Sequence, residues 1–158
     1  MKEIVAKRDV PEMPKDIRIQ YANRKFSTNE RTKIKDLSEK GVRKIVRDVQ
    51  SGKCQSLYLT PNENGEIEPG FLQLEDANGE GRIFLQICAD ERERTAWACF
   101  DLAYLDSDEE SPIETSDGQS VISMRTTMRD HDLAAKCVEW YIRTLEPYPG
   151  MDWLKLTW

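Results

Sequence analysis

Short runs of alternating apolar and polar residues in the middle of the chain constrain the fold more than any other feature. Turn sequences rich in asparagine, glycine and proline separate several of them, as at residues 61–65 and 76–79. A period of two residues indicates strands with one buried face, and such turns favour antiparallel neighbours. The runs are residues 56–60, 71–75, 82–89, 95–102 and, beyond a polar segment, 121–128. We expect an antiparallel meander in which residues 82–89 and 95–102 form a hairpin.

Two further segments place apolar residues at helical spacing. The first spans about residues 36–50 and ends at Ser51 and Gly52, and its other face carries a basic stripe. The second spans residues 130–145, begins at Asp130 as an N-cap and ends before two prolines. Its apolar stripe consists of Leu133, Ala134, Cys137, Val138, Tyr141, Ile142 and Leu145. The pattern predicts an α+β fold, an antiparallel β-sheet with two amphipathic helices packed on it.

The length of 158 residues is most simply one domain, residues 1–158. We expect residues 1–30 to be a loosely packed N-terminal region, with short strands at residues 4–7 and 17–21. At the other end, residues 151–158 predict a terminal strand. Trp140 and Trp153 are expected in the core, because large aromatic side chains favour burial.

Charge is unevenly distributed along the chain. Residues 1–60 hold fifteen Lys/Arg and eight Asp/Glu, a net charge of +7, whereas residues 61–117 hold three and sixteen, a net charge of −13. Residues 118–158 balance, and the whole chain carries −6. The acidic stretch peaks at residues 106–110 within a segment, 106–117, that is expected to be a polar loop. An exposed acidic patch attracts a basic partner, although it also serves simply as a solubilising surface.

The residues typical of catalytic and metal sites are sparse. His131 is the one histidine, and the start of a helix predicts a solvent-facing position for it. Cys54, Cys88, Cys99 and Cys137 are dispersed without a CxxC pair, which predicts buried, reduced thiols and no zinc site. No phosphate-binding loop occurs, and residues 106–117 do not match a calcium-binding loop. We therefore expect no catalytic residue, no metal and no cofactor.

Nucleic acid and membranes are not expected partners. The basic segment 31–53 could contact phosphates, but only Tyr21 and Phe26 lie near it for stacking, and the acidic block opposes binding. No stretch approaches the roughly 18 apolar residues of a membrane span. The N-terminus has no apolar region typical of a signal peptide. These features predict a cytoplasmic protein.

The last forty or so residues show a further pattern. Residues 117–121 form a glycine-containing turn before a strand, the helix 130–145 follows, and residues 146–155 combine a proline-bearing loop with a tryptophan. This order resembles the immunity proteins of bacterial polymorphic-toxin and contact-dependent growth inhibition systems. Gly118 and Trp153 fill the glycine and tryptophan positions of that pattern. The basic N-terminal region, through about Lys53, has no counterpart in it.

The resemblance implies a cytoplasmic protein that binds one cognate toxin domain, 1:1, and blocks its active site. Toxins of this kind are often nucleases or deaminases with basic clefts, which an acidic surface suits. The candidate toxin-binding residues are Asp106, Asp108, Glu109, Glu110, Glu114 and Asp117. Two alternatives stay open: a small enzyme that uses carboxylate acid–base chemistry, and a regulatory adaptor.

Overall fold

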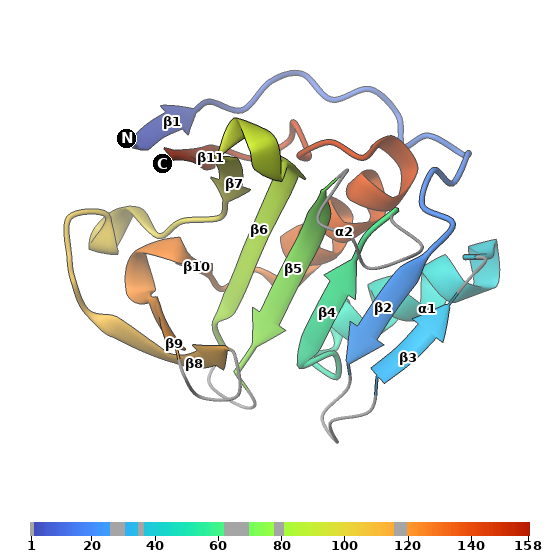
Figure 1. The fold of residues 1–158 in the computed structure, drawn as a ribbon, viewed down its shortest axis with the longest axis horizontal. Coiled ribbons are helices and arrows are strands. Elements are labelled where there is room, and N and C mark those ends of the chain that lie inside the picture. The colour runs from blue at the N-terminus through green and yellow to red at the C-terminus, as the bar shows by residue number, and fades with distance from the viewer. Residues whose placement is uncertain (1, 26–30, 35–36, 62–69, 78–80, 116–119) are drawn as a thin grey trace.

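The computed structural model describes residues 2–25, 31–34, 37–61, 70–77, 81–115 and 120–158, and it places two helices on an antiparallel sheet (Figure 1). The helices are α1 (Glu39–Gln50) and α2 (His131–Thr144). The strands are β1 (Lys2–Val5), β2 (Ala22–Lys25), β3 (Arg31–Ile34), β4 (Ser56–Leu59), β5 (Phe71–Asp76), β6 (Ile83–Asp90), β7 (Thr95–Ala98), β8 (Glu110–Thr115), β9 (Ser120–Ser123), β10 (Thr127–Met128) and β11 (Trp153–Thr157). The α+β expectation is confirmed.

The expected meander forms the centre of the sheet. The strand order is β1-β11-β7-β6-β5-β4-β2-β3, and β10 also pairs with β6. Leu57 lies opposite Leu74, and Leu74 lies opposite Leu85, so the apolar residues of neighbouring strands share one face. Both helices cover that face, behind the strands in Figure 1.

Apolar packing between the helices and this face forms the core. Ile45 of α1 and Val138 and Tyr141 of α2 are buried together with the leucines of the central strands. Each fully buried leucine or isoleucine contributes about 1.5–3 kcal/mol relative to exposure. Trp140 and Trp153 are also buried, as expected. Asp130 caps α2 by accepting a hydrogen bond from the Leu133 backbone N–H at 3.0 Å, which confirms the predicted start of this helix.

A buried arginine joins the helix layer to the N-terminal segment. The Arg143 guanidinium donates to both carboxylate oxygens of Glu39, at 2.8 and 2.9 Å, and so ties α2 to α1. It also donates to the Lys15 carbonyl at 2.7 Å. The forked geometry of arginine suits such a junction, because several donors project in one plane.

The N-terminal region differs from the sequence-based expectation in its strands. No strand forms at residues 17–21, because the backbone N–H groups of Arg18 and Ile19 donate instead to the Ile142 carbonyl at the end of α2. Ile19 is fully buried there, whereas most of residues 2–16 are exposed. The first strand lies at Lys2–Val5 rather than at residues 4–7, because it pairs with β11.

Three expectations for residues 95–128 were wrong. The run 95–102 is a strand only to Ala98, after which Leu102–Tyr104 form a 3₁₀ turn. Residues 106–117 are not simply a loop, because β8 occupies Glu110–Thr115. The run 121–128 is not one strand, because the 3₁₀ turn Met124–Thr126 separates β9 from β10 and redirects the chain from the β8–β9 hairpin back to β6.

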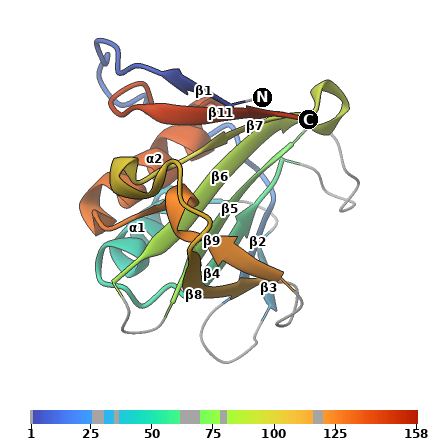
Figure 2. The same cartoon turned by 90° about the vertical axis from the view of Figure 1, so that its left-hand side faces the viewer.

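The hairpin lies away from the helices. In Figure 2 the helices are on one side of the central strands, and β8 and β9 are on the other.

No helix in the described part of the chain is long and apolar enough to span a membrane.

Candidate functional site

The acidic segment, defined here as residues 101–115, carries five of the six candidate residues on its surface. Asp106, Asp108, Glu109, Glu110 and Glu114 are all exposed. The sixth, Asp117, lies outside the described residues. The structure therefore places these five carboxylates at the surface of one contiguous segment.

The alternation of side chains along β8 places two of these carboxylates on the exposed face of the strand. Within β8, Ser111 and Ile113 are buried, while Glu110, Pro112 and Glu114 are exposed. The Ser111 hydroxyl accepts a hydrogen bond from the Ile113 backbone N–H at 3.1 Å, so its buried oxygen is satisfied. The buried side anchors the strand over β5, which it contacts, and leaves the carboxylates facing solvent.

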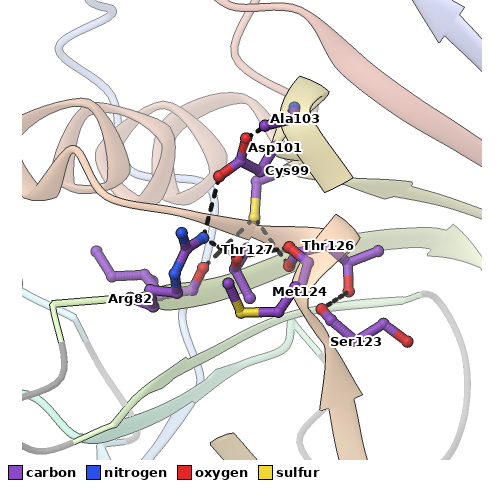
Figure 3. Close-up of polar contacts among 9 residues, drawn as sticks. Arg82, Cys99, Asp101, Ala103, Ser123, Met124, Thr126 and Thr127 are labelled. Atoms are coloured by element: carbon purple, nitrogen blue, oxygen red, sulfur yellow. Dashed lines mark hydrogen bonds and ion pairs between the residues drawn. The ribbon is translucent and has the colours of Figure 1, made fainter. Parts of the chain in front are cut away.

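A buried arginine holds the start of the acidic segment (Figure 3). Arg82, 5% exposed, donates through Nη1 to Asp101 Oδ2 at 3.0 Å and to Thr127 Oγ1 at 2.9 Å. Thr127 Oγ1 in turn donates to the Met124 carbonyl at 2.7 Å. Because a buried charge is costly without partners, the Arg82–Asp101–Thr127 network strongly constrains these three positions relative to each other.

Asp101 has a second role in the same network. Its Oδ1 accepts a hydrogen bond from the Ala103 backbone N–H at 3.0 Å and caps the 3₁₀ turn. The Tyr104 ring on that turn lies beneath the Arg82 guanidinium, with 5.1 Å between the guanidinium carbon and the ring centroid. One carboxylate thus links the buried arginine to the backbone that leads into the acidic residues.

Backbone contacts with the returning chain hold the rest of the segment. The Asp101 N–H donates to the Arg125 carbonyl, and the Met124 N–H donates to the Glu109 carbonyl, both at 2.9 Å. Arg125 Nη2 donates to the Ser107 carbonyl at 2.8 Å and to the Asp108 carboxylate at 3.1 Å. The Asp108 side chain is fully exposed, so that ion pair contributes little stability, and the main effect of Arg125 is to position the backbone.

Two exposed apolar side chains accompany the carboxylates, one within the acidic segment and one on β9, which pairs with β8. Leu102, at the tip of the 3₁₀ turn, is 72% exposed, and Val121 on β9 is also exposed. Protein–protein interfaces often combine a few apolar contacts with a charged rim. The surface of this region therefore combines several exposed carboxylates with two exposed apolar side chains.

The thiol next to this network is structural. Cys99 Sγ donates to the Thr126 carbonyl at 3.3 Å and to the Ile83 carbonyl at 3.6 Å (Figure 3). Burial raises the pKa of the Cys99 thiol to about 12. A thiol that does not ionise is a poor nucleophile, so Cys99 serves packing rather than chemistry. All four cysteines are buried thiols, as the sequence predicts.

His131 occupies a different position from the one expected. Its Nε2 lies 3.0 Å from Asp76 Oδ2, and the His131 side chain is only a quarter exposed. The contact joins the first turn of α2 to the end of β5, so His131 is a tertiary contact rather than a solvent-facing residue. Among the described residues, no serine or cysteine is hydrogen-bonded to His131, and no group of three metal-ligand side chains occurs.

Arg82, Asp101, Thr127 and Leu102 were missed by the sequence analysis. A charged residue immediately before a buried strand was the available signal for Arg82, and Asp101 before a short apolar run resembles an N-cap. Neither signal says which residues will meet, since Arg82 and Thr127 are 45 positions apart.

Comparison of the chain with protein-family models, with curated proteins and with solved structures found no match.

Proposed function

We propose that this protein is an immunity protein, which binds a cognate toxin domain 1:1 and neutralises it by covering a basic active-site cleft with the acidic segment. One observation carries the proposal: five exposed acidic side chains lie on a backbone that buried Arg82 and its partners hold in place. The resemblance of residues 117–155 to immunity proteins supports it independently.

An ordered acidic surface suits inhibition better than a charged tail does. Clustered carboxylates attract a basic partner over several ångströms and raise the association rate, most strongly at low ionic strength. Because Asp101 and Arg125 already fix the backbone, little further ordering is needed on binding. Less free energy is then lost in forming the complex.

The charge of the segment also indicates the kind of toxin. Nucleases and nucleic-acid deaminases hold a phosphate backbone in a cationic groove. Carboxylates can occupy such a groove in place of phosphates. The same charge disfavours nucleic acid and anionic membrane as partners of this protein itself. A cytoplasmic location, where such a toxin would act, is part of the proposal.

The tryptophan of the family-like pattern lies apart from the proposed binding surface. Trp153 is 2% exposed and packs in the core with α2, so its role is in the fold. The β8–β9 hairpin, which carries Glu110 and Glu114 of the acidic segment, lies on the other side of the central strands from α2 (Figure 2).

Co-expression with the toxin domain encoded by the neighbouring upstream gene tests the proposal. We expect a 1:1 complex on co-purification, and survival of cells that make both proteins. A variant with Asp106→Asn, Asp108→Asn, Glu109→Gln and Glu110→Gln should protect poorly. The matched control changes four exposed acids elsewhere, Glu3→Gln, Asp9→Asn, Glu12→Gln and Asp16→Asn, and alters net charge equally. Equal protection by both variants would exclude the acidic segment as the inhibitory surface.

A small enzyme remains the second candidate, and His131 with its carboxylate partner Asp76 is the pair it would use. His131→Ala is expected to protect fully against the toxin, because the proposal assigns His131 no chemistry. Loss of protection in a His131→Ala protein of unchanged stability would favour the enzyme instead.

A further inference from the structure

A cleft on the helix side of the molecule has the features of a small-molecule site. Its volume is about 380 Å³, and it lies between the chain that follows β1, the end of α2 and the loop that leads to β11. The rings of Trp97, Trp140, Tyr148 and Trp153 line it. Ligand pockets commonly have this size and an apolar wall with few polar groups. The cleft is separate from the acidic segment, which contributes no residue to it.

Trp140 provides an unusual donor at this cleft. The residue is 5% exposed, and its Nε1–H is buried with no hydrogen-bond partner among the described residues. The neighbouring tryptophan differs, because Trp153 Nε1 donates to the Tyr148 carbonyl at 2.7 Å. Buried polar groups in proteins nearly always have a partner, so an unpaired one at the wall of a cleft favours an acceptor supplied from outside the chain.

The ring geometry leaves the cleft suited to a flat apolar group. The Trp140 and Tyr148 rings meet edge to face, with 5.7 Å between centroids and 63° between planes. The Tyr148 ring also lies close over Gly150, where a Cβ would come within 2.4 Å of it. Aromatic walls at fixed angles favour an aromatic ligand over a flexible aliphatic one.

Charged side chains at the rim of the cleft limit the chemical class of the ligand further. Arg8 and Glu146 both line the cleft and are exposed. The backbone N–H of Arg8 donates to the Pro149 carbonyl at 2.9 Å, which holds Arg8 at the rim. No ion pair joins its guanidinium to a carboxylate in the described part of the chain. An arginine in this position recognises a carboxylate, while Glu146 suits an amino group.

We propose that this cleft binds a small aromatic carboxylate. Its ring lies against the tryptophan and tyrosine rings, an oxygen accepts a hydrogen bond from Trp140 Nε1, and its negative charge pairs with Arg8. Aromatic amino acids share this chemistry and add an ammonium group for Glu146. The proposed ligand site is independent of the proposed toxin inhibition, because the acidic segment contributes no residue to the cleft.

Indole N–H resonances test the proposal directly. The ¹⁵N-labelled protein would be titrated with indole-3-acetate, with tryptophan, and with 3-methylindole, which lacks the carboxylate. We expect the Trp140 cross-peak to move and to saturate with a Kd at or below about 1 mM for indole-3-acetate. The cross-peak of Trp158, which is outside the cleft and 63% exposed, should not move. Tighter binding of tryptophan than of indole-3-acetate would indicate that Glu146 also contributes.

Two variants separate the parts of the site. Arg8→Gln should weaken indole-3-acetate about two- to fivefold, as for loss of an exposed ion pair, and leave 3-methylindole unchanged. Trp140→Phe keeps a ring but removes the donor, and should weaken indole-3-acetate about fivefold. Because this variant lacks the Trp140 indole N–H, its affinity is followed from the cross-peak of Trp97, which also lines the cleft. Arg129→Gln changes an exposed arginine outside the cleft and should have no effect. Unchanged ¹⁵N–¹H spectra elsewhere would show that each variant is folded.

Several results would overturn the proposal. A Trp140 cross-peak that no probe moves, at an upfield position typical of an N–H directed at the Tyr148 ring, would show that the donor is satisfied internally. Equal affinity for indole-3-acetate and 3-methylindole would exclude carboxylate recognition. Equal weakening by Arg8→Gln and Arg129→Gln would exclude Arg8 as the anion partner.

Discussion

The acidic segment and the layer formed by α2 and β11 are held in place by different forces. Around α2 and β11, Val138, Tyr141 and Trp153 are buried in one continuous apolar core. The acidic segment is held mainly by directed polar contacts, those of Arg82 with Asp101 and of Arg125 with the Ser107 carbonyl. Apolar packing contributes most of the free energy of folding, whereas hydrogen bonds contribute less but fix direction. Stability and toxin binding should therefore respond to different substitutions.

The largest effect on stability is expected in the apolar layer. Trp153→Ala should lower the free energy of unfolding by about 3–5 kcal/mol, because it removes a buried ring and leaves a cavity. The hydrogen bond from Trp153 Nε1 to the Tyr148 carbonyl would also be lost. Chemical denaturation measures the difference. Trp158→Ala, at an exposed site, is the control and should change stability by less than about 0.5 kcal/mol. Similar values for the two variants would contradict the assignment of Trp153 to the core.

The second-largest loss of stability is expected for Arg82→Gln. It leaves the Asp101 carboxylate and the Thr127 hydroxyl without their buried donor, at a cost of about 2 kcal/mol. The cost stays below that of a fully buried pair because Asp101 is a quarter exposed. Unlike Trp153→Ala, this variant should also slow toxin association, since the acidic backbone loses its anchor. Arg129→Gln is the control. Equal association rates for the two arginine variants would contradict the proposal that the Arg82–Asp101–Thr127 network holds the acidic segment in the geometry that binds the toxin.

The four acidic-segment substitutions Asp106→Asn, Asp108→Asn, Glu109→Gln and Glu110→Gln should act on binding alone. Exposed charges contribute little to stability, so the free energy of unfolding should stay within about 0.5 kcal/mol of wild type. The association rate should fall about tenfold at low salt, because electrostatic steering is lost, and less at high salt. Stopped-flow association over a range of salt concentrations measures this. A rate and salt dependence equal to wild type would show that the segment is a solubilising surface.

Leu102→Ala should produce a smaller effect of a different kind. Leu102 carries no charge, so the association rate and its salt dependence should not change. Dissociation should be about fivefold faster if the exposed leucine enters an apolar pocket on the toxin. Val10→Ala, at another exposed apolar side chain, provides the control. Unchanged dissociation in Leu102→Ala would restrict the toxin interface to the carboxylates.

The smallest expected effect is the pH dependence from Asp76. Burial raises the pKa of the Asp76 carboxyl above its ordinary value of 3.8, and the His131 hydrogen bond opposes part of that rise. The folded protein therefore keeps the proton to higher pH than the unfolded chain. Stability from this group is complete below pH 3.8 and is lost as the pH rises through the folded-state pKa. The difference in free energy of unfolding between wild type and Asp76→Asn, measured from pH 3.5 upward, should show this loss. A difference that grows in favour of wild type with rising pH would contradict it.

Local patterns predicted the regular elements well. The meander follows from period-two runs, and α2 begins at its predicted cap because Asp130 satisfies an N-terminal N–H locally. The failures fall where distant contacts decide. Residues 17–21 are apolar enough for a strand, but their N–H groups bond to the Ile142 carbonyl of α2. The acidic stretch was expected to be a loop, yet burial of Ser111 and Ile113 makes part of it a strand.

The sequence by itself determined the fold class, the burial of Trp140 and Trp153 and the acidity of residues 106–114, since these depend on composition and on the spacing of a few residues. Only the tertiary structure decided that Arg82 would anchor the acidic segment and that Trp140 would line a cleft with Arg8. In the network, Arg82 lies 19 positions from Asp101 and 45 positions from Thr127. Arg8 and Trp140 line the same cleft although they are more than a hundred positions apart in the sequence. Their geometry depends on how the whole sheet and its helices pack, because no local pattern specifies which distant donor meets which acceptor.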